Sequence, residues 1–585
     1  MGSLFFYLLC LLPFVLCKNA QRPNDNWQQL NQTVGGRLFR GTPLALPCFS
    51  FYEGHPHDRD PASCAALQKN YTDADIRIDL YAGFMNSQDE ICASNASNQC
   101  LLDSMNPLDP LAYTDVSCNQ GSVSPYYVAI KTAEDIRAAF EFSRRTGTRL
   151  SIKATGHDYL TRNSLKGSLA LWMRWLQDIS LTDAFVPDSC GHTYKQATVA
   201  MTVGAGVTMG EAYTFADKHK VTYIGGYGST IGVSGGFTQG GGHSVLSPVY
   251  GLGVDRVLQY KIVTPDGVLR TTNECQNPDL FWALRGGGGG TFGVVIESTH
   301  KVEPVIPLAV ASMSYPIAPD MSNVLPFLNM CVNNSLRWAK EGWGGHIQFM
   351  TTNLIHVNPL LSLEEAEKSM GPATEFVKSQ NGTVVIEMLP SWNAFYQKYV
   401  VPNTASVGQG LIIAARFMPA SLFETTEGRA KLMDFLGEIV AQGALPYIPM
   451  DTPYYLSSRE GKSFGNDTSI TPSWRNSIWE LSWPGVWPWN STVEEKQKAI
   501  ASQNSLMEKA KELAPDSGAY MNEAFPWTVD WQQDWWGESS YMRLLEIKKR
   551  YDPDGLLSCW KCIGFKVSDS KEKFPCFGKS DEAGN

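Results

Sequence analysis

The stretch at residues 225–243, GGYGSTIGVSGGFTQGGGH, constrains the fold more than any other part of the chain. About half of its residues are glycine, so its backbone is permissive and offers many unobstructed N–H groups. A flexible linker would have a similar composition, but a linker does not need the apolar side chains that alternate at Ile231, Val233 and Phe237. We therefore expect a loop that wraps a bound group and donates backbone hydrogen bonds to it.

An earlier segment, residues 149–168, combines a predicted strand with a Gly-His-Asp sequence. The alternation at residues 150–154 indicates a short buried strand, which breaks at Thr155-Gly156. His157 and Asp158 follow, and the glycine lets the backbone approach a flat or bulky ligand. Alone, such a histidine is more often a hydrogen-bonded loop residue, so the interpretation depends on the neighbouring motifs.

A third glycine-rich turn lies at residues 285–293. Residues 288–293 formally match G-x-G-x-x-G, which in a Rossmann fold follows a strand and opens a helix. Here a predicted short helix at 278–284 precedes the turn and a predicted strand follows it. This order disfavours binding of NAD.

Together these segments resemble the flavin-binding motifs of the vanillyl-alcohol-oxidase/berberine-bridge-enzyme-like superfamily, whose FAD domain is called PCMH-type. The runs YMNE at 520–523 and YDPDGL at 551–556 resemble the berberine-bridge C-terminal segment, and PSWR at 472–475 resembles a Pro-Ala-Trp-Arg motif of fungal members. The sequences QCLLD at 99–103 and QGGGH at 239–243 are most similar to fungal isoamyl-alcohol-oxidase-like members. The resemblance covers about residues 126–564.

The resemblance implies an α+β fold, with a two-part PCMH-type FAD-binding domain and an α+β substrate domain built on an antiparallel sheet backed by helices. We divide the chain into a signal peptide (1–17), a Cys-rich lead segment (18–121), the FAD-binding domain (122–303), the substrate domain (304–516) and a C-terminal segment that returns to the FAD domain (517–585). In the substrate domain, helical patterns at 324–340, 362–379, 425–442 and 493–513 alternate with strand-like runs at 346–352, 383–388 and 410–416.

The family bonds a histidine to the 8-methyl group of FAD, and the matching residue here is His157. Asp158 or a backbone group would orient its ring. Gly228 aligns with a cysteine that forms a second bond in some relatives, so the resemblance implies attachment through His157 alone, and Ile231 aligns with a position that gates dioxygen. The full cofactor-binding set that we expect is His157, Gly156, Asp158, Thr155, Gly228, Ser229, Thr230, Ile231, Gly232, Gly235, Gly236, Gly242, His243, Gly293, Val295 and Asn522.

The chemistry implied is transfer of a hydride from a carbon bearing OH or NH, while a base removes the proton from the heteroatom. The family usually takes this base from a Tyr or Glu, and Tyr520 and Glu480 are the candidates, although the sequence favours a structural role for each. We expect a secreted, monomeric oxidase that acts on a small-molecule alcohol and passes electrons to dioxygen, releasing hydrogen peroxide. The alternatives are a dehydrogenase or oxidative cyclase of secondary metabolism with another electron acceptor, and a non-catalytic glycoprotein.

Secretion is expected from two features. Residues 4–17 (LFFYLLCLLPFVLC) form an apolar run of signal-peptide length, and no second apolar stretch is long enough to span a bilayer. The second feature is a set of Asn-X-Ser/Thr sequons, the acceptors of N-glycosylation, which begin at Asn31, Asn70, Asn95, Asn333, Asn381, Asn466 and Asn490.

The net charge of −10 argues against nucleic-acid binding.

Cysteines and tryptophans each allow two interpretations. Five cysteines between 48 and 118 indicate a disulfide-linked lead segment without chemistry of its own. Cys559 and Cys562 have the spacing of a metal or thioredoxin motif, but they form an isolated pair, so we expect a disulfide or free structural cysteines and no metal site. The tryptophans between 479 and 536 could stack on a sugar or an aromatic substrate, yet ordinary packing explains most of them.

Overall fold

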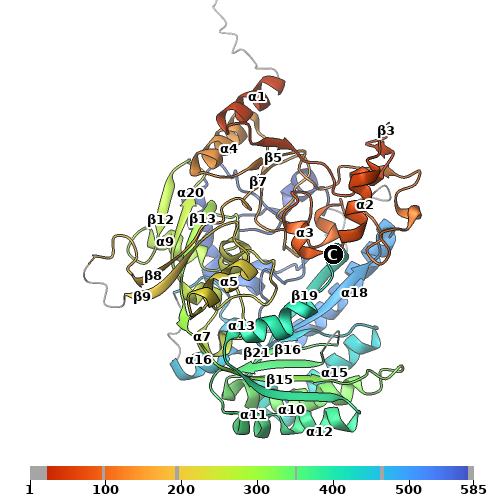
Figure 1. Ribbon diagram of the computed structural model, residues 1–585, viewed down its shortest axis with the longest axis vertical. Coiled ribbons are helices and arrows are strands. Elements are labelled where there is room, and N and C mark those ends of the chain that lie inside the picture. Colours follow the sequence, from red (N-terminus) through yellow and green to blue (C-terminus); the bar gives the residue numbers. More distant parts are fainter. Residues whose placement is uncertain (1–22, 95–98, 192–196, 350–351, 461–466, 578–585) are drawn as a thin grey trace, which may run out of the picture.

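The computed structural model describes residues 23–94, 99–191, 197–349, 352–460 and 467–577 (Figure 1). The predicted signal peptide and the sequons at Asn95 and Asn466 lie outside these residues. The fold is α+β, as expected, with one half of the molecule built on two sheets and the other half on a five-stranded sheet covered by helices (Figure 1).

The first sheet of the FAD half carries the Gly-His motif. Its strand order is β1 (Leu38–Arg40), β5 (Tyr126–Ala129), β7 (Leu169–Trp172) and β6 (Leu150–Lys153). Helix α4 (Ala133–Thr146) connects β5 to β6; a capping box between Thr132 and Asp135 begins it, and Gly147 in the left-handed region ends it. Strands β5, β7 and β6 are parallel, so their carboxyl ends lie at the same side of the sheet. Residues 154–158 follow β6 at that side.

The second sheet of the FAD half is antiparallel. Its order is β12 (Leu269–Thr272), β11 (Val257–Val263), β13 (Val294–Lys301), β9 (Thr198–Gly204) and β8 (Ile179–Phe185). Helix α5 (Met209–Lys218) follows β9, and the glycine-rich segment comes after α5. That segment is less irregular than predicted, since it contains a π-helical turn, η5 (Val233–Phe237), and a single α-turn, α6 (Thr238–Gly240).

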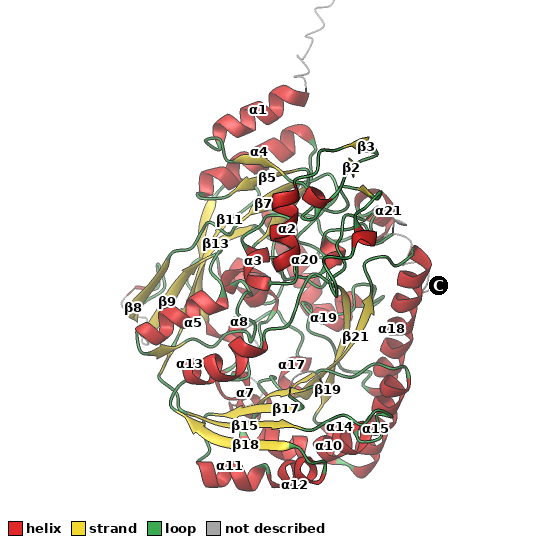
Figure 2. Cartoon of the chain, turned by 45° about the vertical axis from the view of Figure 1, so that its right-hand side comes forward, coloured by secondary structure: helices red, strands yellow, loops and turns green. Residues whose placement is uncertain are grey.

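The substrate half is a five-stranded antiparallel sheet with helices on its outer face (Figure 2). The strand order is β18 (Thr383–Leu389), β15 (Leu308–Ser314), β17 (Leu354–Asn358), β16 (Gly344–Ile347) and β20 (Ile448–Pro449). The helices are α10 (Val324–Glu341), α11 (Leu363–Ser369), α12 (Gly371–Ser379) and α15 (Thr426–Ala441). A further helix, α18 (Val493–Leu513), packs instead against the two long strands described below. The prediction of a single helix at 362–379 was wrong. Two helices occupy this range and are separated at Met370, because the Gly371-Pro372 pair begins a new helix with proline in its first turn.

Two long strands cross from the substrate half toward the rest of the molecule. Strand β19 (Gly410–Pro419) pairs antiparallel with β21 (Ser477–Trp487). The tryptophans of β21, with Trp338 and Trp343, are buried in one large apolar cluster. Packing therefore accounts for the tryptophan-rich region, as expected; Trp527, Trp531, Trp535 and Trp536 are buried as well.

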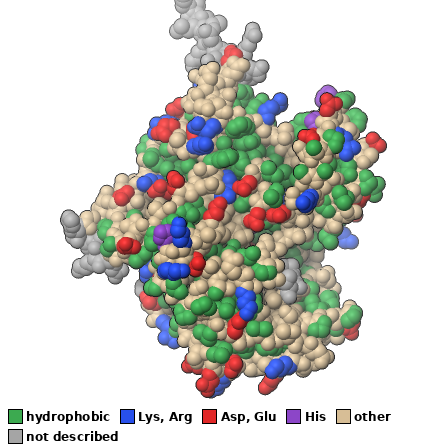
Figure 3. Space-filling view, viewed as in Figure 1, with side chains coloured by type: hydrophobic (Ala, Val, Ile, Leu, Met, Phe, Trp, Pro, Cys, Tyr) green, Lys and Arg blue, Asp and Glu red, His purple; other side chains and the backbone are tan. Residues whose placement is uncertain are grey.

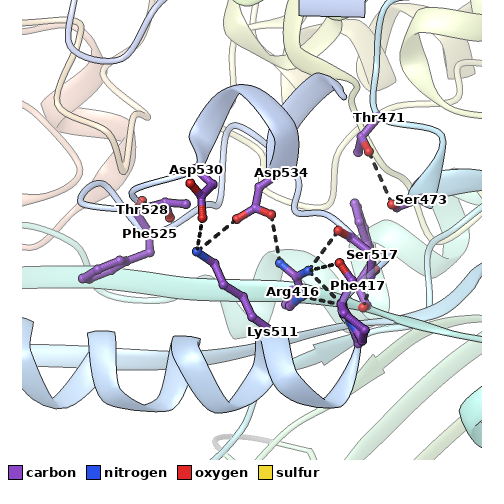
Figure 4. Close-up of polar contacts among 12 residues, drawn as sticks. Arg416, Phe417, Thr471, Ser473, Lys511, Ser517, Phe525, Thr528, Asp530 and Asp534 are labelled. Atoms are coloured by element: carbon purple, nitrogen blue, oxygen red, sulfur yellow. Dashed lines mark hydrogen bonds and ion pairs between the residues drawn. The ribbon is translucent and has the colours of Figure 1, made fainter. Parts of the chain in front are cut away.

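The C-terminal segment bridges the two halves. Helices α19 (Trp531–Trp536) and α20 (Glu538–Tyr551) pack against β11 and helix α9 (Pro278–Leu284) of the FAD half. On the other side, the buried guanidinium of Arg416 on β19 donates to Asp534 Oδ1 at 3.1 Å and to the carbonyls of Ala514 and Ser517 (Figure 4). A charged hydrogen-bond network thus fixes this segment to the substrate half.

The lead segment is joined to the FAD half by a strand and by hydrogen bonds. Its strand β1 joins the first sheet, and the buried Nζ of Lys153 donates to three of its carbonyls, those of Leu80, Tyr81 and Gly83, at 2.6–3.0 Å. The disulfides are Cys48–Cys64, Cys100–Cys118, Cys92–Cys576, Cys190–Cys275 and Cys559–Cys562, and among the described residues Cys331 is unpaired and buried. Of the two possibilities expected for Cys559 and Cys562, the structure has the disulfide.

The described part of the chain has no helix that is both long and apolar enough to span a bilayer. On the face shown in Figure 3, acidic and basic side chains are interspersed with apolar and neutral ones.

Candidate flavin-binding and active site

A cavity of about 1300 Å³ lies where the two halves meet. The glycine-rich segment at 225–243, predicted to wrap a ligand, meets the glycine-rich turn at 285–293 at its wall, where a Cβ added to Gly289 would lie 3.0 Å from the Cα of Gly236. Most of the expected cofactor-binding residues line this cavity: Thr155, Gly156, His157, Asp158, Gly228, Ser229, Thr230, Ile231, Gly232, Gly235, Gly236, His243, Gly293, Val295 and Asn522. Gly242 does not line it, but its N–H donates to the hydroxyl of Tyr520 at 3.2 Å.

His157 stands at the cavity end of β6. Gly156 before it has φ +103°, and a Cβ there would lie 3.1 Å from both Gly83 O and Lys153 Cε, so the turn requires glycine. The His157 side chain is open to the cavity, yet the surrounding protein disfavours its charged form and lowers its pKa to about 4. The imidazole is therefore neutral at ordinary pH, which is the form that can act as a nucleophile.

The orientation of the His157 ring comes from Thr230, not from Asp158. His157 Nε2 and Thr230 Oγ1 are 2.7 Å apart, which joins the Gly-His loop to the glycine-rich loop. Asp158 instead accepts from the backbone N–H groups of Leu160 and Arg162, both at 2.9 Å, and so stabilises its own turn. The proposed role of Asp158 in orienting the ring was wrong.

The cavity wall fits a large, polar, flat ligand. Arg162 and Asn163 line it. The buried guanidinium Nε and Nη1 and both amide atoms of Asn163 have no hydrogen-bond partner in the protein, although Nε forms an ion pair with Asp158 Oδ2 at 3.5 Å. Buried polar groups are seldom left unpaired, so these atoms point to a ligand with matching polar edges. The glycine-rich wall leaves room for such a ligand's bulk, and the residues present fit FAD.

A cluster of acids and histidines occupies another part of the wall. His243 lies between two carboxylates, with Nδ1 at 3.0 Å from Asp451 Oδ2 and Nε2 at 3.0 Å from Glu523 Oε1. Asp451 is shared with His346, whose Nε2 is 3.2 Å away, and it also accepts from the backbone N–H of Gly345 at 2.9 Å. His243, His346 and Glu523 reach the cavity, whereas Asp451 is buried behind them.

These contacts set the charge of the cluster. Burial opposes the carboxylate of Asp451, but His346 and His243 outweigh it and hold its pKa below the usual range. Burial also opposes the imidazolium of His243, yet Glu523 and Asp451 together raise its pKa well above the usual range. His243 is therefore a buried cation between two acids.

The two candidate bases named from sequence lie beside this cluster in different positions. Tyr520 lines the cavity, and its hydroxyl accepts from Gly242 N–H and from Asn522 Nδ2 at 2.7 Å. Glu480 does not line the cavity; it is 1% exposed and both carboxylate oxygens lack a hydrogen-bond partner. Burial, and then the nearby Glu523, raise the pKa of Glu480 well above its usual value, so its carboxyl is held as the neutral acid.

Sequence reasoning missed Glu523, Asp451 and His346. Glu523 is adjacent to Asn522 in the YMNE run, but only Asn522 was predicted to bind the cofactor. Asp451 and His346 come from separate strand regions about a hundred residues apart, and no local pattern links them. Only the pairing of β16 with β20 brings them together.

Comparison with known families agrees with this geometry. Residues 124–273 match the family described as FAD binding domain, and residues 519–559 match the family described as berberine and berberine like. The first range holds His157 and the glycine-rich loop, and the second holds Tyr520, Asn522 and Glu523.

Relatives match almost the whole chain. The FAD-linked oxidoreductase ffsJ of Aspergillus flavipes is 43% identical over 94% of this chain and 93% of its own length, and the FAD-linked oxidoreductase OXR2 of Pyricularia oryzae is 42% identical over 97% of each. Among solved structures, the VAO-type flavoprotein MtVAO615 of Myceliophthora thermophila is 26% identical with a TM-score of 0.77, over 94% of this chain and 97% of its own.

Proposed function

Since the chain belongs to the FAD-linked oxidoreductases of the vanillyl-alcohol-oxidase/berberine-bridge-enzyme-like superfamily, we propose that it is an alcohol oxidase with covalently bound flavin. The enzyme removes a hydride from the carbinol carbon of a small-molecule substrate and passes the electrons to dioxygen, releasing hydrogen peroxide. The observation that carries the proposal is the neutral His157 at the wall of the same cavity that the Glu523–His243–Asp451 cluster enters.

In this proposal each flavin-binding group at the cavity wall has a role. His157 forms the covalent bond, and Thr230 fixes the ring for it. Gly228 stands where relatives have a second attaching cysteine, and among the described lining residues the only cysteine, Cys559, is in a disulfide, so we propose a single bond. Arg162 Nη1 and both amide atoms of Asn163, which have no hydrogen-bond partner in the protein, are available to the polar edges of the cofactor. When bound, FAD supplies the two-electron acceptor.

The proton of the substrate hydroxyl goes to Glu523 in this proposal. Its carboxylate is partly open to the cavity, and its Oε1 accepts from His243 Nε2. The imidazolium, which Asp451 holds from the other side, fixes the direction of Glu523 and leaves its second oxygen for the substrate. Tyr520 lies against the same cluster and positions the substrate hydroxyl, while Glu480 acts only through its neighbours.

Secretion and the electron acceptor belong to the proposal as well. Three sequons, at Asn333, Asn381 and Asn490, are exposed, while Asn31 and Asn70 are half-buried. Ile231 lines the cavity at the predicted dioxygen gate, and its bulk favours the alternative of a dehydrogenase with another acceptor. The chain is proposed to act as a monomer.

The test is anaerobic reduction followed by admission of air. A panel of primary and secondary alcohols is added to the purified protein, and the visible flavin absorption is followed. An oxidase loses its colour with one of the alcohols and regains it in air, with one hydrogen peroxide formed per alcohol oxidised. Recovery only with an artificial dye would identify a dehydrogenase, and no bleaching by any alcohol would contradict alcohol oxidation.

A further inference from the structure

The cavity continues beyond the flavin-lining loops into the substrate half. Side chains from four regions line this extension: β19, the loop before β20, β21 and α18. We call this part the apolar arm, and we define it by Leu411, Ile413, Leu445, Pro484, Ala499 and Leu506.

The apolar arm carries no charge. The charged side chains among the described lining residues are Asp158, Arg162 and Glu523, all in the FAD half or the C-terminal segment, and the histidines are His157, His243 and His346. From residue 348 to residue 506, the lining residues of the described chain include no Asp, Glu, Lys or Arg. An ionic group would lose its hydration there without gaining a counter-charge, so the arm selects a neutral molecule.

The polar side chains that line the cavity beside the apolar arm are mostly hydrogen-bonded within the protein. Ser482 Oγ donates to Tyr447 O at 2.8 Å, and Ser502 Oγ donates to Gln442 Oε1 at 2.8 Å. Gln503 Nε2 donates to Pro484 O at 3.3 Å, which leaves its buried Oε1 as an acceptor. A ligand with many hydroxyl groups would find few partners here, and each unpaired hydroxyl would cost free energy on burial.

The aromatic lining points the same way. Sugar recognition relies on broad aromatic faces, and tryptophan is the usual one. The described residues that line the cavity include tyrosines and phenylalanines but no tryptophan, because the tryptophans of β21 point into the core cluster. Among its described residues the arm therefore lacks the tryptophan surface that the tryptophan-rich sequence suggested.

We propose that the apolar arm binds the hydrocarbon body of a neutral, amphipathic alcohol, whose single hydroxyl reaches Glu523 while the rest lies along Leu411, Leu445 and Leu506. This inference rests on the proposed function. In the overall reaction the carbinol loses its C–H hydride and its O–H proton to become a carbonyl, and dioxygen takes up the two electrons and two protons as hydrogen peroxide. Gln503 Oε1 accepts from one further polar group on the substrate body.

The test separates binding from oxidation. Tertiary alcohols have no carbinol hydrogen and cannot be oxidised. Their affinity for the holoenzyme therefore reports on the arm alone. We measure it by titration calorimetry over increasing chain length. Each buried methylene contributes about 0.8 kcal/mol, so we expect Kd to fall about fourfold per added methylene until the arm is full. Primary alcohols of the same lengths are then tested for anaerobic bleaching, with cellobiose as the hydroxyl-rich comparison.

Two matched variants place the effect. Leu445→Lys puts a charge into the arm, and Val529→Lys makes the same change at a 54%-exposed position outside the cavity. We expect the chain-length dependence to disappear in the first and to persist in the second. If Leu445→Lys does not fold, Leu445→Ser serves in its place, with a smaller loss of affinity for the longer alcohols.

The outcomes are distinct. An affinity independent of chain length, or tighter binding of cellobiose than of the longest alcohol, overturns the inference. Length-dependent binding of the tertiary alcohols without oxidation of the primary ones would support the arm and reject the proposed alcohol oxidation. Oxidation of short primary alcohols, together with an affinity that does not depend on chain length, would support alcohol oxidation and reject the arm.

Discussion

At the scale of single residues, the protein sets the protonation of the groups at and behind the cavity wall differently. His157 is neutral because the protein around it disfavours the imidazolium, whereas His243 is held charged by Glu523 and Asp451 despite burial. Glu480, a few ångströms from His243 and Glu523, is held as a neutral acid. One wall of the cavity thus offers a nucleophile, and another offers a charge-balanced acid–base pair.

Glu523→Gln tests the base. The amide keeps the size of the side chain but cannot accept a proton, so we expect kcat to fall by about 10²- to 10⁴-fold. The flavin content should stay unchanged, and Asp530→Asn, at an acid of the same segment that does not line the cavity, should leave kcat unchanged. Full activity of Glu523→Gln would reject its role and return the assignment to Tyr520.

Glu480→Gln tests the buried acid through stability. A carboxyl whose pKa is raised on folding contributes stability below its unfolded pKa, the usual value of 4.5, and loses that contribution as pH rises toward the folded value. The glutamine variant lacks this loss. We expect its Tm to exceed that of the parent by a margin that grows between pH 5 and pH 8, measured by thermal denaturation; a margin that shrinks with pH would contradict the raised pKa.

The sequence could predict residues that belong to a local pattern, but not those that meet only through folding. His157 and the glycine-rich loop were predicted because a strand break followed by Gly-His, and a glycine-rich run with buried side chains, are local patterns. Asp451 and His346 could not be predicted, since their contact depends on strand pairing across about a hundred residues. The absence of charge in the apolar arm is likewise a property of four regions together.

At the scale of elements, the glycine turns determine how closely the segments around the cavity approach one another. Gly286 follows α9 and has φ +134°, and a Cβ there would lie 2.5 Å from the backbone N of Ile470. Its carbonyl accepts from Trp536 Nε1 at 2.9 Å, so this one residue contacts the FAD half, the substrate half and the C-terminal segment. Helix and strand patterns in a sequence do not reveal such a junction. At this position the sequence predicted only a turn.

Gly286→Ala should be strongly destabilising, by about 2 kcal/mol or more, because alanine is strained at this φ and also meets backbone. Gly437→Ala is the matched control: Gly437 lies inside α15, and a Cβ there meets nothing within 4 Å. We expect it to stabilise the protein by up to about 1 kcal/mol. Equal Tm values for the two variants would contradict the crowding at Gly286.

At the scale of the whole molecule, the lead segment and the chain's last described residues close the structure around the cavity. Cys92 and Cys576 are 484 residues apart, and next to their disulfide Ser94 N–H donates to Cys576 O at 3.2 Å. The lead segment also bonds to the substrate half, where Ser87 N–H donates to Gln409 O at 2.8 Å. The sequence predicted a disulfide-linked lead segment but not this closure, since connectivity is not encoded in spacing.

Replacing Cys92 and Cys576 together by serine tests the closure. A cross-link over a long stretch restricts the unfolded chain more than a short one, so we expect a loss of about 2–4 kcal/mol and a lower Tm. The matched control is the double serine variant of Cys559 and Cys562, which are separated by three positions and should give a smaller loss. A larger loss in the control would contradict a structural role for the long-range link.

The central claim is that His157 holds a flavin covalently, and the most direct test is the absorption spectrum of the purified protein before and after acid precipitation, with His157→Ala and Glu523→Gln in parallel. We expect the yellow colour to stay with the precipitated parent and with Glu523→Gln, and to be absent or released in His157→Ala. A colourless parent protein would contradict flavin binding, and colour that survives acid in His157→Ala would place the attachment on another residue.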